Sequence, residues 1–591
     1  MVGRFDDIVG NTFRMSEEEG RSKVTTLKEA VRQYVKPGMT LHFSGTHSST
    51  SAAIYEVIRQ FCDKDPRFTI IGGMGGIRLN LIHLGMVKKM IGSFFGDGYP
   101  MPGPNPIIQK AYREGAVEFE NWTMLTPVQR LMAGALGFPF IPTRSIIGSS
   151  MAEENKDSFT VMDDPFGSGR KIGLLSALQS DITFVHGLAA DRYGNTILIP
   201  PLAENLWGAM GCRKGAIVSV EKIVSTEFIR EHSASVRIPG YVVNCVCEEP
   251  FGAHPGGLIN YGIPELEGYG EDYDFIIEHR QATRDPKALD AWIKHWVLDC
   301  DSHRDYLRKL GSQRLLYLKG KVSKNSWEQE LEQFSEEISV SEEYSPVEMM
   351  AVVGARKIKE KVLKGDYKTI LAGIGVSNLA AWLAYYDLKN EDYDIDLAAE
   401  IGFYGYAPRP GDPWIFSFYN IPTCKMATDI PDILGLIIGG ENNRALGALG
   451  GGQIDKYGNV NSTKVPGELF LVGSGGANDV ASAAREVVVL LNQSRGRYLE
   501  QVPYITYTGD RVSTLVSTMG VFEKLGPGKE LTLTECFPDP KLSTMEQRIK
   551  QIKEHCGWEL KVAPKVKDVH PPTLDELKLL RLFDPKGYYL T

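Results

Sequence analysis

The chain has 591 residues, 43% of them hydrophobic and 24% charged, which is the balance of a globular protein that folds in water. This length exceeds that of one ordinary domain, so we expect more than one. The formal net charge of −9 is mild for such a chain, and no basic stripe interrupts it. Composition therefore argues against nucleic acid or an anionic membrane surface as a partner.

The start of the chain lacks the long apolar run of a secretory signal, and no uncharged apolar segment is long enough for a membrane span. None of the eight cysteines forms a Cys-x-x-Cys pair, which argues against a zinc site and a disulfide framework. Cys245 and Cys247 alternate within an apolar run and are expected to pack on one face of a strand. We predict a cytoplasmic protein with reduced thiols and no metal.

Two segments that lie far apart in the sequence share one order of predicted elements. Residues 26–45 predict an amphipathic helix, a Pro-Gly turn and a strand that ends in glycine. Residues 347–375 predict a helix, a Gly-Asp turn and a strand that also ends in glycine. A loop of small residues and a further helix follow in both cases.

The motif Asp-x-Tyr-Gly-Asn occurs at residues 191–195 and again at 455–459. Each aspartate can open a turn in which Gly194 or Gly458 takes a positive φ. Two matches in the same order predict duplicated α/β halves. The apolar runs FTIIGG, TFVHG, AIVSV, LFLVG and EVVVLL alternate with predicted helices, which indicates mainly parallel, covered sheets.

Composition changes between the two repeated segments. Residues 321–345 are polar and acidic, which is typical of a solvated linker, and they include a predicted surface helix. We therefore predict one domain over residues 1–320, an acidic linker over 321–345 and a second domain over 346–591.

Two glycine-rich loops of the second repeat lie where a strand passes into a helix: GIGVSN at 373–378 and GSGGAND at 473–479. Bare backbone N–H groups near a helix N-terminus stabilise an anion or a developing oxyanion. Neither loop contains the full dinucleotide or P-loop pattern, and tight-turn geometry explains such loops equally well. For a third glycine-rich segment, FTIIGGMGGIRLN at 68–80, a structural role is at least as favoured.

Glu400 is the one acidic residue in the apolar and aromatic stretch AAEIGFYGYAP, residues 398–408. The preceding residues, YDIDLAA at 393–399, alternate in polarity and predict a half-buried strand. Glu400 is thus expected at a strand end, where α/β sheets present ligands. A glutamate in such a place is more often solvated or salt-bridged than chemically active.

These motifs together resemble the family I coenzyme A transferases, and glutaconate CoA-transferase in particular, with its two subunits fused in one chain. The first half carries ALGFPFIPT and PFGAHPGG, and the second half carries AAEIG, GGGQIDKYGNVNST and VGSGGAND. The resemblance implies two tandem open α/β domains of the CoA-transferase (NagB/RpiA-like) type, with mainly parallel sheets, packed against each other. It also implies a homodimer or a higher homo-oligomer.

The resemblance further implies that Glu400 is a catalytic nucleophile. It would carry CoA as a glutamyl thioester while CoA moves, by a ping-pong mechanism, from an acyl-CoA to a free carboxylic acid. Coenzyme A is then a substrate, and no other cofactor is expected. The oxyanion and CoA-binding positions implied are Gly373, Gly375, Gly473, Gly475, Gly476 and Ala477, the last standing where many members have phenylalanine.

Two other readings stay open. Residues 96–125 resemble members of this fold that open a ring of a CoA ester by hydrolysis, and other members decarboxylate a CoA ester. Glu118 and Glu120 alternate with apolar residues and so share one strand face, which makes Glu120 a possible second carboxylate, although a surface-strand role is favoured. The third reading is a non-enzymatic acyl-CoA-binding module, but a binder needs no nucleophile beside an oxyanion-type loop.

The aromatic run at residues 403–419 hints at a bulky or apolar acyl group, with Arg409 available for a remote carboxylate. Core packing explains much of this run equally well. The acyl and acid substrates are therefore left open by the sequence.

Overall fold

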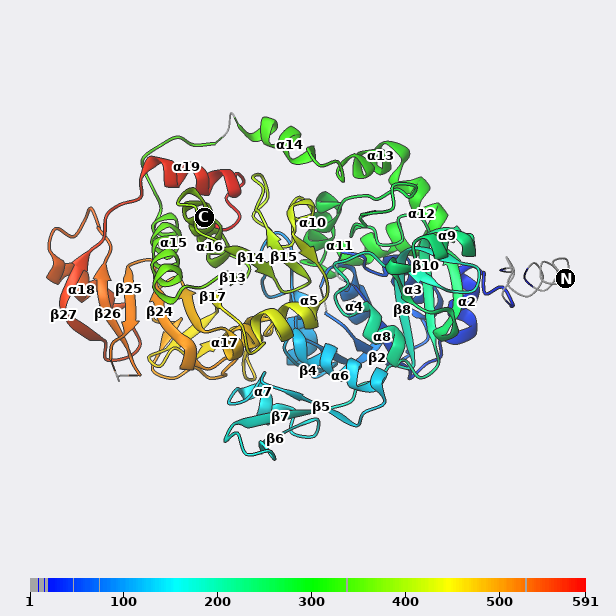
Figure 1. The fold of residues 1–591 in the computed structure, drawn as a ribbon, viewed down its shortest axis with the longest axis horizontal. Coiled ribbons are helices and arrows are strands. Elements are labelled where there is room, and N and C mark those ends of the chain that lie inside the picture. Colours follow the sequence, from blue (N-terminus) through cyan, green and yellow to red (C-terminus); the bar gives the residue numbers. More distant parts are fainter. Residues whose placement is uncertain are drawn as a thin grey trace.

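The computed structural model describes residues 9, 15, 20–45, 47–73, 75–335, 338–526 and 529–590. The chain forms two α/β halves, each built on its own mainly parallel sheet (Figure 1). The sheet of the first half lies to the right in that view and the sheet of the second half to the left. The predicted fold class is confirmed.

The first sheet has the strand order β4-β3-β2-β1-β8-β10-β12, and all of these neighbours pair in parallel. The short strands β9 and β11 add antiparallel pairs beside β8. The strands are β1 (Thr40–Phe43), β2 (Phe68–Ile71), β3 (Val87–Gly92), β4 (Glu118–Asn121), β8 (Ile182–Asp191), β9 (Thr196–Ile197), β10 (Ala216–Val224), β11 (Val236–Ile238) and β12 (Val243–Glu248).

The second sheet has the order β16-β15-β14-β13-β17-β22-β24-β25-β26-β27, with the parallel run from β14 to β24 at its centre. The strands are β13 (Thr369–Ala372), β14 (Asp396–Ala399), β15 (Phe403–Tyr406), β16 (Met426–Ala427), β17 (Ala445–Leu449), β22 (Glu486–Leu490), β24 (Val512–Val516), β25 (Gly520–Lys524), β26 (Leu531–Cys536) and β27 (Lys561–Asp568).

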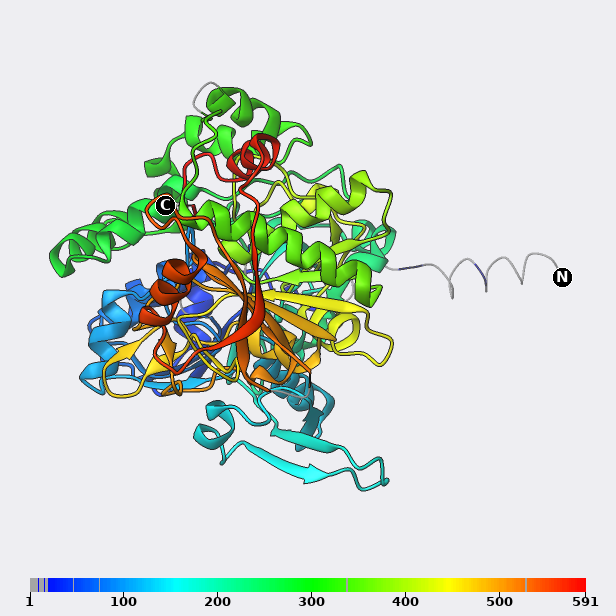
Figure 2. The ribbon, with the colours of Figure 1, turned by 90° about the vertical axis from the view of Figure 1, so that its left-hand side faces the viewer.

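Three small sheets complete the strands. They are β5 (Phe140–Thr143) with β7 (Lys171–Ser176) and β6 (Phe159–Asp163); β18 (Gln453–Asp455) with β19 (Val460–Asn461) and β23 (Tyr498–Leu499); and β20 (Lys464–Val465) with β21 (Leu469–Phe470). The β5-β7-β6 sheet projects from the lower side of the molecule in Figures 1 and 2.

Helices accompany both sheets. In the first half they are α2 (Leu27–Tyr34), α3 (Ser51–Phe61), α4 (Leu79–His83), α5 (Pro106–Arg113), α6 (Leu125–Leu136), α7 (Ser150–Glu154), α8 (Asn205–Gly211), α9 (Thr226–Glu231), α10 (Tyr273–Ala282), α11 (Pro286–Ile293), α12 (His303–Leu310) and α13 (Ser312–Gly320). After them come α14 (Ser326–Ser335), α15 (Pro346–Gly365), α16 (Val376–Asn390), α17 (Ala477–Ala483), α18 (Met545–Glu554) and α19 (Leu574–Phe583).

The duplication predicted from the sequence is visible in the topology. The parallel run β2-β1-β8-β10-β12 of the first sheet corresponds to β14-β13-β17-β22-β24 of the second. Helices α2 and α15 precede the matching strands β1 and β13, and α3 and α16 follow them. Side-chain hydrogen bonds stabilise the N-termini of α2 and α15: Thr26 caps α2, and Ser345 and Glu348 form a capping box on α15.

The two Asp-x-Tyr-Gly-Asn turns have the same geometry. Asp191 accepts hydrogen bonds from the backbone N–H groups of residues 193 and 195, both at 3.0 Å, and Asp455 accepts them from residues 457 and 459, also at 3.0 Å. Gly194 has φ +98° and Gly458 has φ +80°. In each turn the asparagine Oδ1 then accepts from a glycine N–H at 2.9 Å, Gly240 in one half and Gly509 in the other.

Two expectations for individual strands need correction. β14 is buried along its whole length rather than half-buried, because it pairs with β13 on one side and β15 on the other within the sheet. The run LFLVG does not join a large parallel sheet. Only Leu469 and Phe470 form a strand, paired antiparallel to β20, and Val472 then accepts a hydrogen bond from Phe95 of the first half at 2.7 Å.

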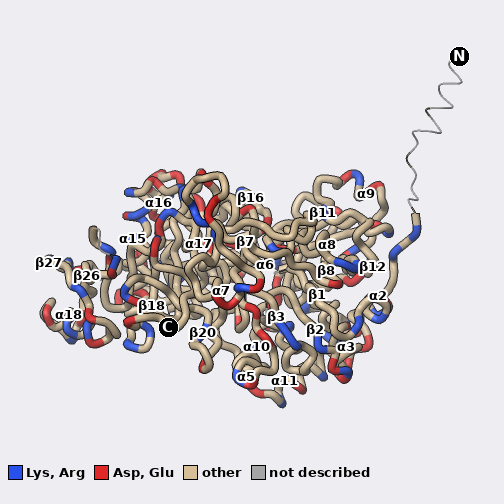
Figure 3. Tube along the Cα trace, turned by 90° about the horizontal axis from the view of Figure 1, so that it is seen from below, with Lys and Arg blue, Asp and Glu red and all other residues tan. Residues whose placement is uncertain are grey.

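Helix α14 lies in the segment predicted as a linker and crosses the top of the molecule in Figure 1. Acidic and basic residues are interspersed along the chain in Figure 3. No helix among the described residues combines the length and apolar composition that crossing a bilayer requires. All eight cysteines are free thiols, with Cys245 and Cys247 buried on β12.

Candidate active site

One cavity of about 870 Å³ is lined by both halves of the chain. The first half contributes the loops that follow β1, β2 and β3, and the second half contributes the ends of β13, β14 and β17. Carboxyl ends of parallel strands are where open α/β sheets bind ligands, so the location is the one this fold predicts. The lining includes every position that the resemblance singled out in the second half: Gly373, Gly375, Glu400, Gly473, Gly475, Gly476 and Ala477.

Glu400 is the first residue after β14, as the sequence predicted. Its side chain is partly exposed and opens onto the cavity. The carboxylate lies directly against Gly476, because a β-carbon added to that glycine would overlap Glu400 Oε2. Gly402, two residues later, has φ +132° and packs against the backbone of Thr428, which turns the chain sharply after the glutamate.

The glycine loop 473–476 is held by the first half of the chain. Gly475 N–H donates to the Ser93 carbonyl at 2.9 Å, and Met124 N–H donates to the Gly475 carbonyl at 2.8 Å. Gly473 has φ +106° and lies so close to the Ser93 carbonyl that a β-carbon would sit 2.6 Å from that oxygen. Glycine is therefore needed at 473 for the contact between the halves and at 476 for the approach of Glu400.

The last two residues of the run 473–479 form hydrogen bonds between the two halves. Asn478 Oδ1 accepts from Ile146 N–H at 2.8 Å, and Asp479 accepts from the Ser145 hydroxyl at 2.6 Å and from Leu125 N–H at 3.0 Å. Asn478 and Asp479 are buried. The run GSGGAND thus presents backbone to the cavity with its glycines and docks onto the first half with its last two residues.

Burial sets the charge state of the two carboxylates in this region. Desolvation raises the pKa of Glu400 to about 8; the nearby negative charge of Asp479 adds to this rise, and the Gly476 N–H opposes it. Desolvation likewise raises the pKa of Asp479 to about 6, against the hydrogen bonds from Ser145 and its neighbours. A proton is therefore held near the site at neutral pH, and Glu400 is a stronger base than an exposed glutamate.

The other glycine loop also reaches the cavity but is less constrained. Gly375 has φ +118° and is the residue before α16. Gly373 has ordinary space around it, since a β-carbon there would come no closer than 3.6 Å to any neighbour. A small side chain would fit at 373, so its glycine is not dictated by the local packing.

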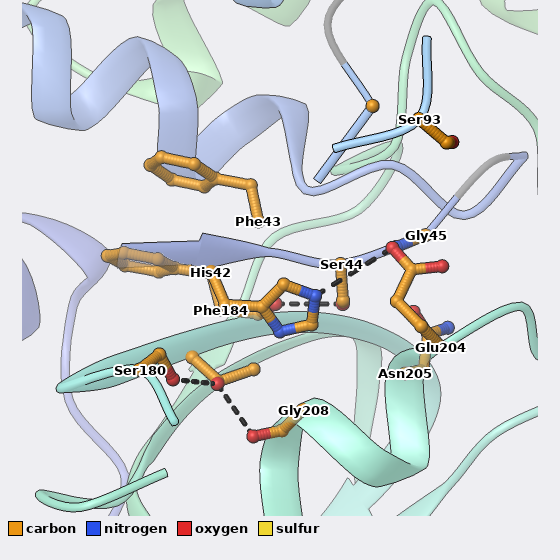
Figure 4. A network of polar contacts seen from close by, with 12 residues as sticks. His42, Phe43, Ser44, Gly45, Ser93, Ser180, Phe184, Glu204, Asn205 and Gly208 are labelled. Carbon is orange, nitrogen blue, oxygen red and sulfur yellow. Dashed lines mark hydrogen bonds and ion pairs between the residues drawn. The ribbon is translucent and has the colours of Figure 1, made fainter. Parts of the chain in front are cut away.

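The first half contributes a polar cluster that sequence reasoning missed (Figure 4). Glu204 lines the cavity and is the residue directly before α8. Its Oε1 accepts from Gly45 N–H at 3.3 Å and lies 3.7 Å from His42 Nε2. His42 is buried on β1, and both of its ring nitrogens lie without a hydrogen-bond partner among the described residues. Gly208 is required beside it, because a β-carbon there would overlap the imidazole ring.

A second His–Glu pair lines another part of the cavity. His47 Nδ1 lies 3.1 Å from Glu271 Oε1, and the other oxygen of Glu271 accepts from the Tyr273 hydroxyl at 2.9 Å. Tyr273 stacks on Tyr99 with ring centroids 4.1 Å apart. One oxygen of Glu271 therefore accepts a hydrogen bond, and the other lies close to His47, whose Nδ1 has no hydrogen-bond partner among the described residues.

Three candidates from the sequence lie elsewhere. Glu120 is not among the cavity-lining residues; it pairs with Lys89 at 2.6 Å and Arg130 at 2.8 Å, and these partners lower its pKa against the effect of burial. Lys89 also bridges to Glu118, so the two glutamates do share a strand face. The guanidinium of Arg409 stacks on Trp327 of α14, 4.9 Å from the ring centroid, and so does not serve the cavity.

Glu204 was missed because the internal repeat cannot be aligned there. Glu204 directly precedes α8, and the residue at the same place in the second half is Gly476, which directly precedes α17. The loops between the Asp-x-Tyr-Gly-Asn turns and these two helices differ in length, so the two residues do not align. The one available signal was a glutamate directly before a short helix. No cluster of three or more His, Cys, Asp or Glu side chains suited to a metal is present in the described part of the chain.

Comparison with known proteins agrees with this geometry. The sequence profile of the family described as Coenzyme A transferase matches residues 24–249 and 441–542. One of the two subunits of glutaconate CoA-transferase from Acidaminococcus fermentans is 29% identical over 325 residues, covering 50% of this chain and 95% of the relative. The other subunit of the same enzyme is 28% identical over 162 residues, covering 24% of this chain and 56% of the relative.

A solved acyl-CoA transferase from E. coli O157:H7, YdiF, in a thioester complex with CoA, has the same fold over nearly the whole chain. The TM-score is 0.62 at 16% identity, with 95% of this chain and 96% of that chain covered. The two halves are thus each similar to a different glutaconate CoA-transferase subunit, and their single-chain arrangement is similar to that of YdiF. The family profile matches more than half of the residues of this chain. The chain therefore belongs to the coenzyme A transferase family, as a family I enzyme with both halves fused in one polypeptide.

Proposed function

We propose that this enzyme moves CoA between an acyl-CoA and a free carboxylic acid through a covalent glutamyl-CoA thioester on Glu400. The observation that carries the proposal is the position of the Glu400 carboxylate, which lies against Gly476 on the wall of a cavity shared by both halves. A binding protein has no need of a desolvated carboxylate at that place.

The reaction divides into balanced exchanges. The Glu400 carboxylate attacks the carbonyl carbon of the acyl-CoA and expels CoA thiolate, leaving an acyl-glutamyl anhydride. The thiolate then attacks the side-chain carbonyl of Glu400, which forms the enzyme thioester and releases the first carboxylic acid as its anion. A second carboxylate reverses both steps and leaves as its own CoA ester.

Desolvation supports Glu400 in this role. Its raised pKa makes the ionised carboxylate a more reactive nucleophile than one in water, at the cost of a smaller ionised fraction at neutral pH. Each tetrahedral intermediate carries an oxyanion, and the Gly476 N–H, which already acts on the Glu400 carboxylate, is the loop donor placed to stabilise it. One such donor contributes about 3–4 kcal/mol in studied enzymes. The N–H groups of Gly473, Gly475 and Ala477 already donate to backbone carbonyls.

The test is mass spectrometry of the intact protein after incubation with an acyl-CoA and no acceptor acid. We expect CoA attached through Glu400 and an inactive protein after borohydride treatment only when acyl-CoA is present. Glu400→Gln keeps the shape but removes the nucleophile, so the adduct should vanish and turnover should fall by about 10⁴-fold or more.

Glu120→Gln is the matched control, since Glu120 lies outside the cavity lining. If Glu400→Gln retains near-normal activity while Glu120→Gln abolishes it in folded protein, transfer through Glu400 is wrong and CoA-ester hydrolysis takes its place.

A further inference from the structure

Glu204 and Glu400 are carried by segments that touch each other. Pro201 packs beside Gly402, Leu202 N–H donates to the Thr428 carbonyl at 2.9 Å, and Ala203 forms a β-bridge with Asp429. Glu204 is the next residue in the first of these segments. Glu204 and the proposed nucleophile therefore line the cavity from neighbouring segments.

The cavity has an apolar wall. Its lining includes Met124, Pro127, Val128, Leu131, Ile401 and Ile430. Met124, Val128 and Ile430 also pack in one hydrophobic cluster with Ala203, which places them next to the Glu204 segment. An acyl chain attached at Glu400 that follows this wall would run along hydrocarbon toward the carboxylate of Glu204.

Glu204 keeps its negative charge. Its carboxylate is desolvated, but His42 and Arg78 together hold its pKa below the ordinary value. In Figure 4, one oxygen is directed at His42 and the other points away from it. No other residue in the described part of the chain donates a hydrogen bond to that second oxygen, Oε2, and the side chain is 14% exposed.

The nearby cation is not free to bind an anion. The Arg78 guanidinium donates to the carbonyls of Gly73 and Gly45, both at 3.0 Å, and to those of Phe43 and Ser44. Arg280, which also lines the cavity, donates to the carbonyls of Tyr99 and Met101 at 2.9 and 3.0 Å and pairs with Asp97. The Arg78 Nε–H has no hydrogen-bond partner among the described residues, but it is buried. A second carboxylate on the acyl chain would thus meet the charge of Glu204 while these donors of both arginines already have partners.

From this arrangement we infer that Glu204 determines acyl specificity: the site takes monocarboxylic acyl groups with a hydroxyl placed to donate to Glu204 Oε2, and it rejects dicarboxylic ones. A neutral donor suits the pocket better than an ammonium group, because Arg78 already balances the charge of Glu204. The inference rests on the proposed function, since it places the acyl chain by its attachment at Glu400.

The experiment measures single-turnover formation of the CoA adduct from three kinds of four-carbon ester: butyryl-CoA, hydroxybutyryl-CoA as the 3-hydroxy and the 4-hydroxy isomer, and succinyl-CoA. We expect the better hydroxy ester to react at least as fast as butyryl-CoA and succinyl-CoA about 100-fold more slowly, because a buried like charge is left unpaired. In Glu204→Gln, the ratio of succinyl to butyryl rates should rise about 10-fold and the ratio of hydroxybutyryl to butyryl should fall about 10-fold.

Glutamine still offers an oxygen to Gly45 N–H, so a merely structural Glu204 would change all three rates by one common factor, and that result overturns the inference. Glu271→Gln removes a charge from the same cavity at a carboxylate that faces His47 and Tyr273, and it should leave both ratios within about twofold. Equal rates for succinyl- and butyryl-CoA in wild type also overturn it, as does a preference for 4-aminobutyryl-CoA over the hydroxy esters. If no ester forms an adduct in wild type, the proposed function itself has failed.

Discussion

At the scale of single residues, three influences set the pKa of Glu400: desolvation, the charge of Asp479 and the Gly476 N–H. The first two favour the protonated carboxylic acid, and the third favours the ionised carboxylate. Because attack on an acyl-CoA needs the ionised carboxylate, the same burial that activates Glu400 also limits how much of it is ready to react.

We therefore expect kcat/KM to rise about tenfold per pH unit below the pKa of Glu400 and to level off above about 8. Asp479→Asn removes the like charge beside Glu400, so the midpoint of this rise should move to lower pH. A pH–rate profile of both proteins checks the prediction. A midpoint that stays fixed, or moves up, would contradict the assigned direction.

A further prediction at this scale concerns Gly476. A methyl group there overlaps Glu400 Oε2, so Gly476→Ala should displace the carboxylate and lower kcat by about 100-fold or more. Gly373→Ala is the control, because the space around Gly373 accommodates a methyl group. Steady-state kinetics of the two variants, with melting temperatures to confirm folding, should separate them; equal losses would mean that the overlap at Gly476 is relieved without harm.

At the scale of elements, the two Asp-x-Tyr-Gly-Asn turns are repeated structural devices. Asp191 and Asp455 are both buried, and each satisfies two backbone N–H groups and an asparagine side chain. Their placement after β8 and β18, outside the cavity lining, agrees with the structural role that the sequence favoured.

Replacing either aspartate by alanine leaves buried donors unsatisfied, so Asp191→Ala and Asp455→Ala should each lower the free energy of unfolding by about 2–3 kcal/mol. Denaturant unfolding of the two variants measures this loss. Similar losses are expected because the hydrogen bonds match; a turn that tolerates alanine at no cost would show that its aspartate is dispensable.

At the scale of the whole molecule, the site exists only because two halves meet. The first half holds the glycine loop through the Ser93 carbonyl and Met124 N–H, while the second half supplies Glu400. The boundary of the two domains at 321–345 remains a prediction, and α14 lies within it.

Assembly of the chain is a prediction at this scale as well. By analogy with the family we expect a homodimer or higher homo-oligomer, and light scattering at micromolar concentration should report at least twice the chain mass of 65.5 kDa. Because both halves of the site are in one polypeptide, activity per chain should not fall on dilution as long as the fold persists. A stable monomer would count against the assembly.

The amino-acid sequence by itself determined the duplication, the mainly parallel sheets and the place of Glu400 directly after a strand, because periodicity, glycine positions and turn residues act locally. Only the tertiary structure decided which residues share the cavity. It placed Glu120 in an ion-pair network, stacked Arg409 on Trp327 and brought Glu204 and Glu400 into the lining of one cavity. The physical reason is that these placements depend on contacts between residues far apart in the chain, and no local pattern encodes them.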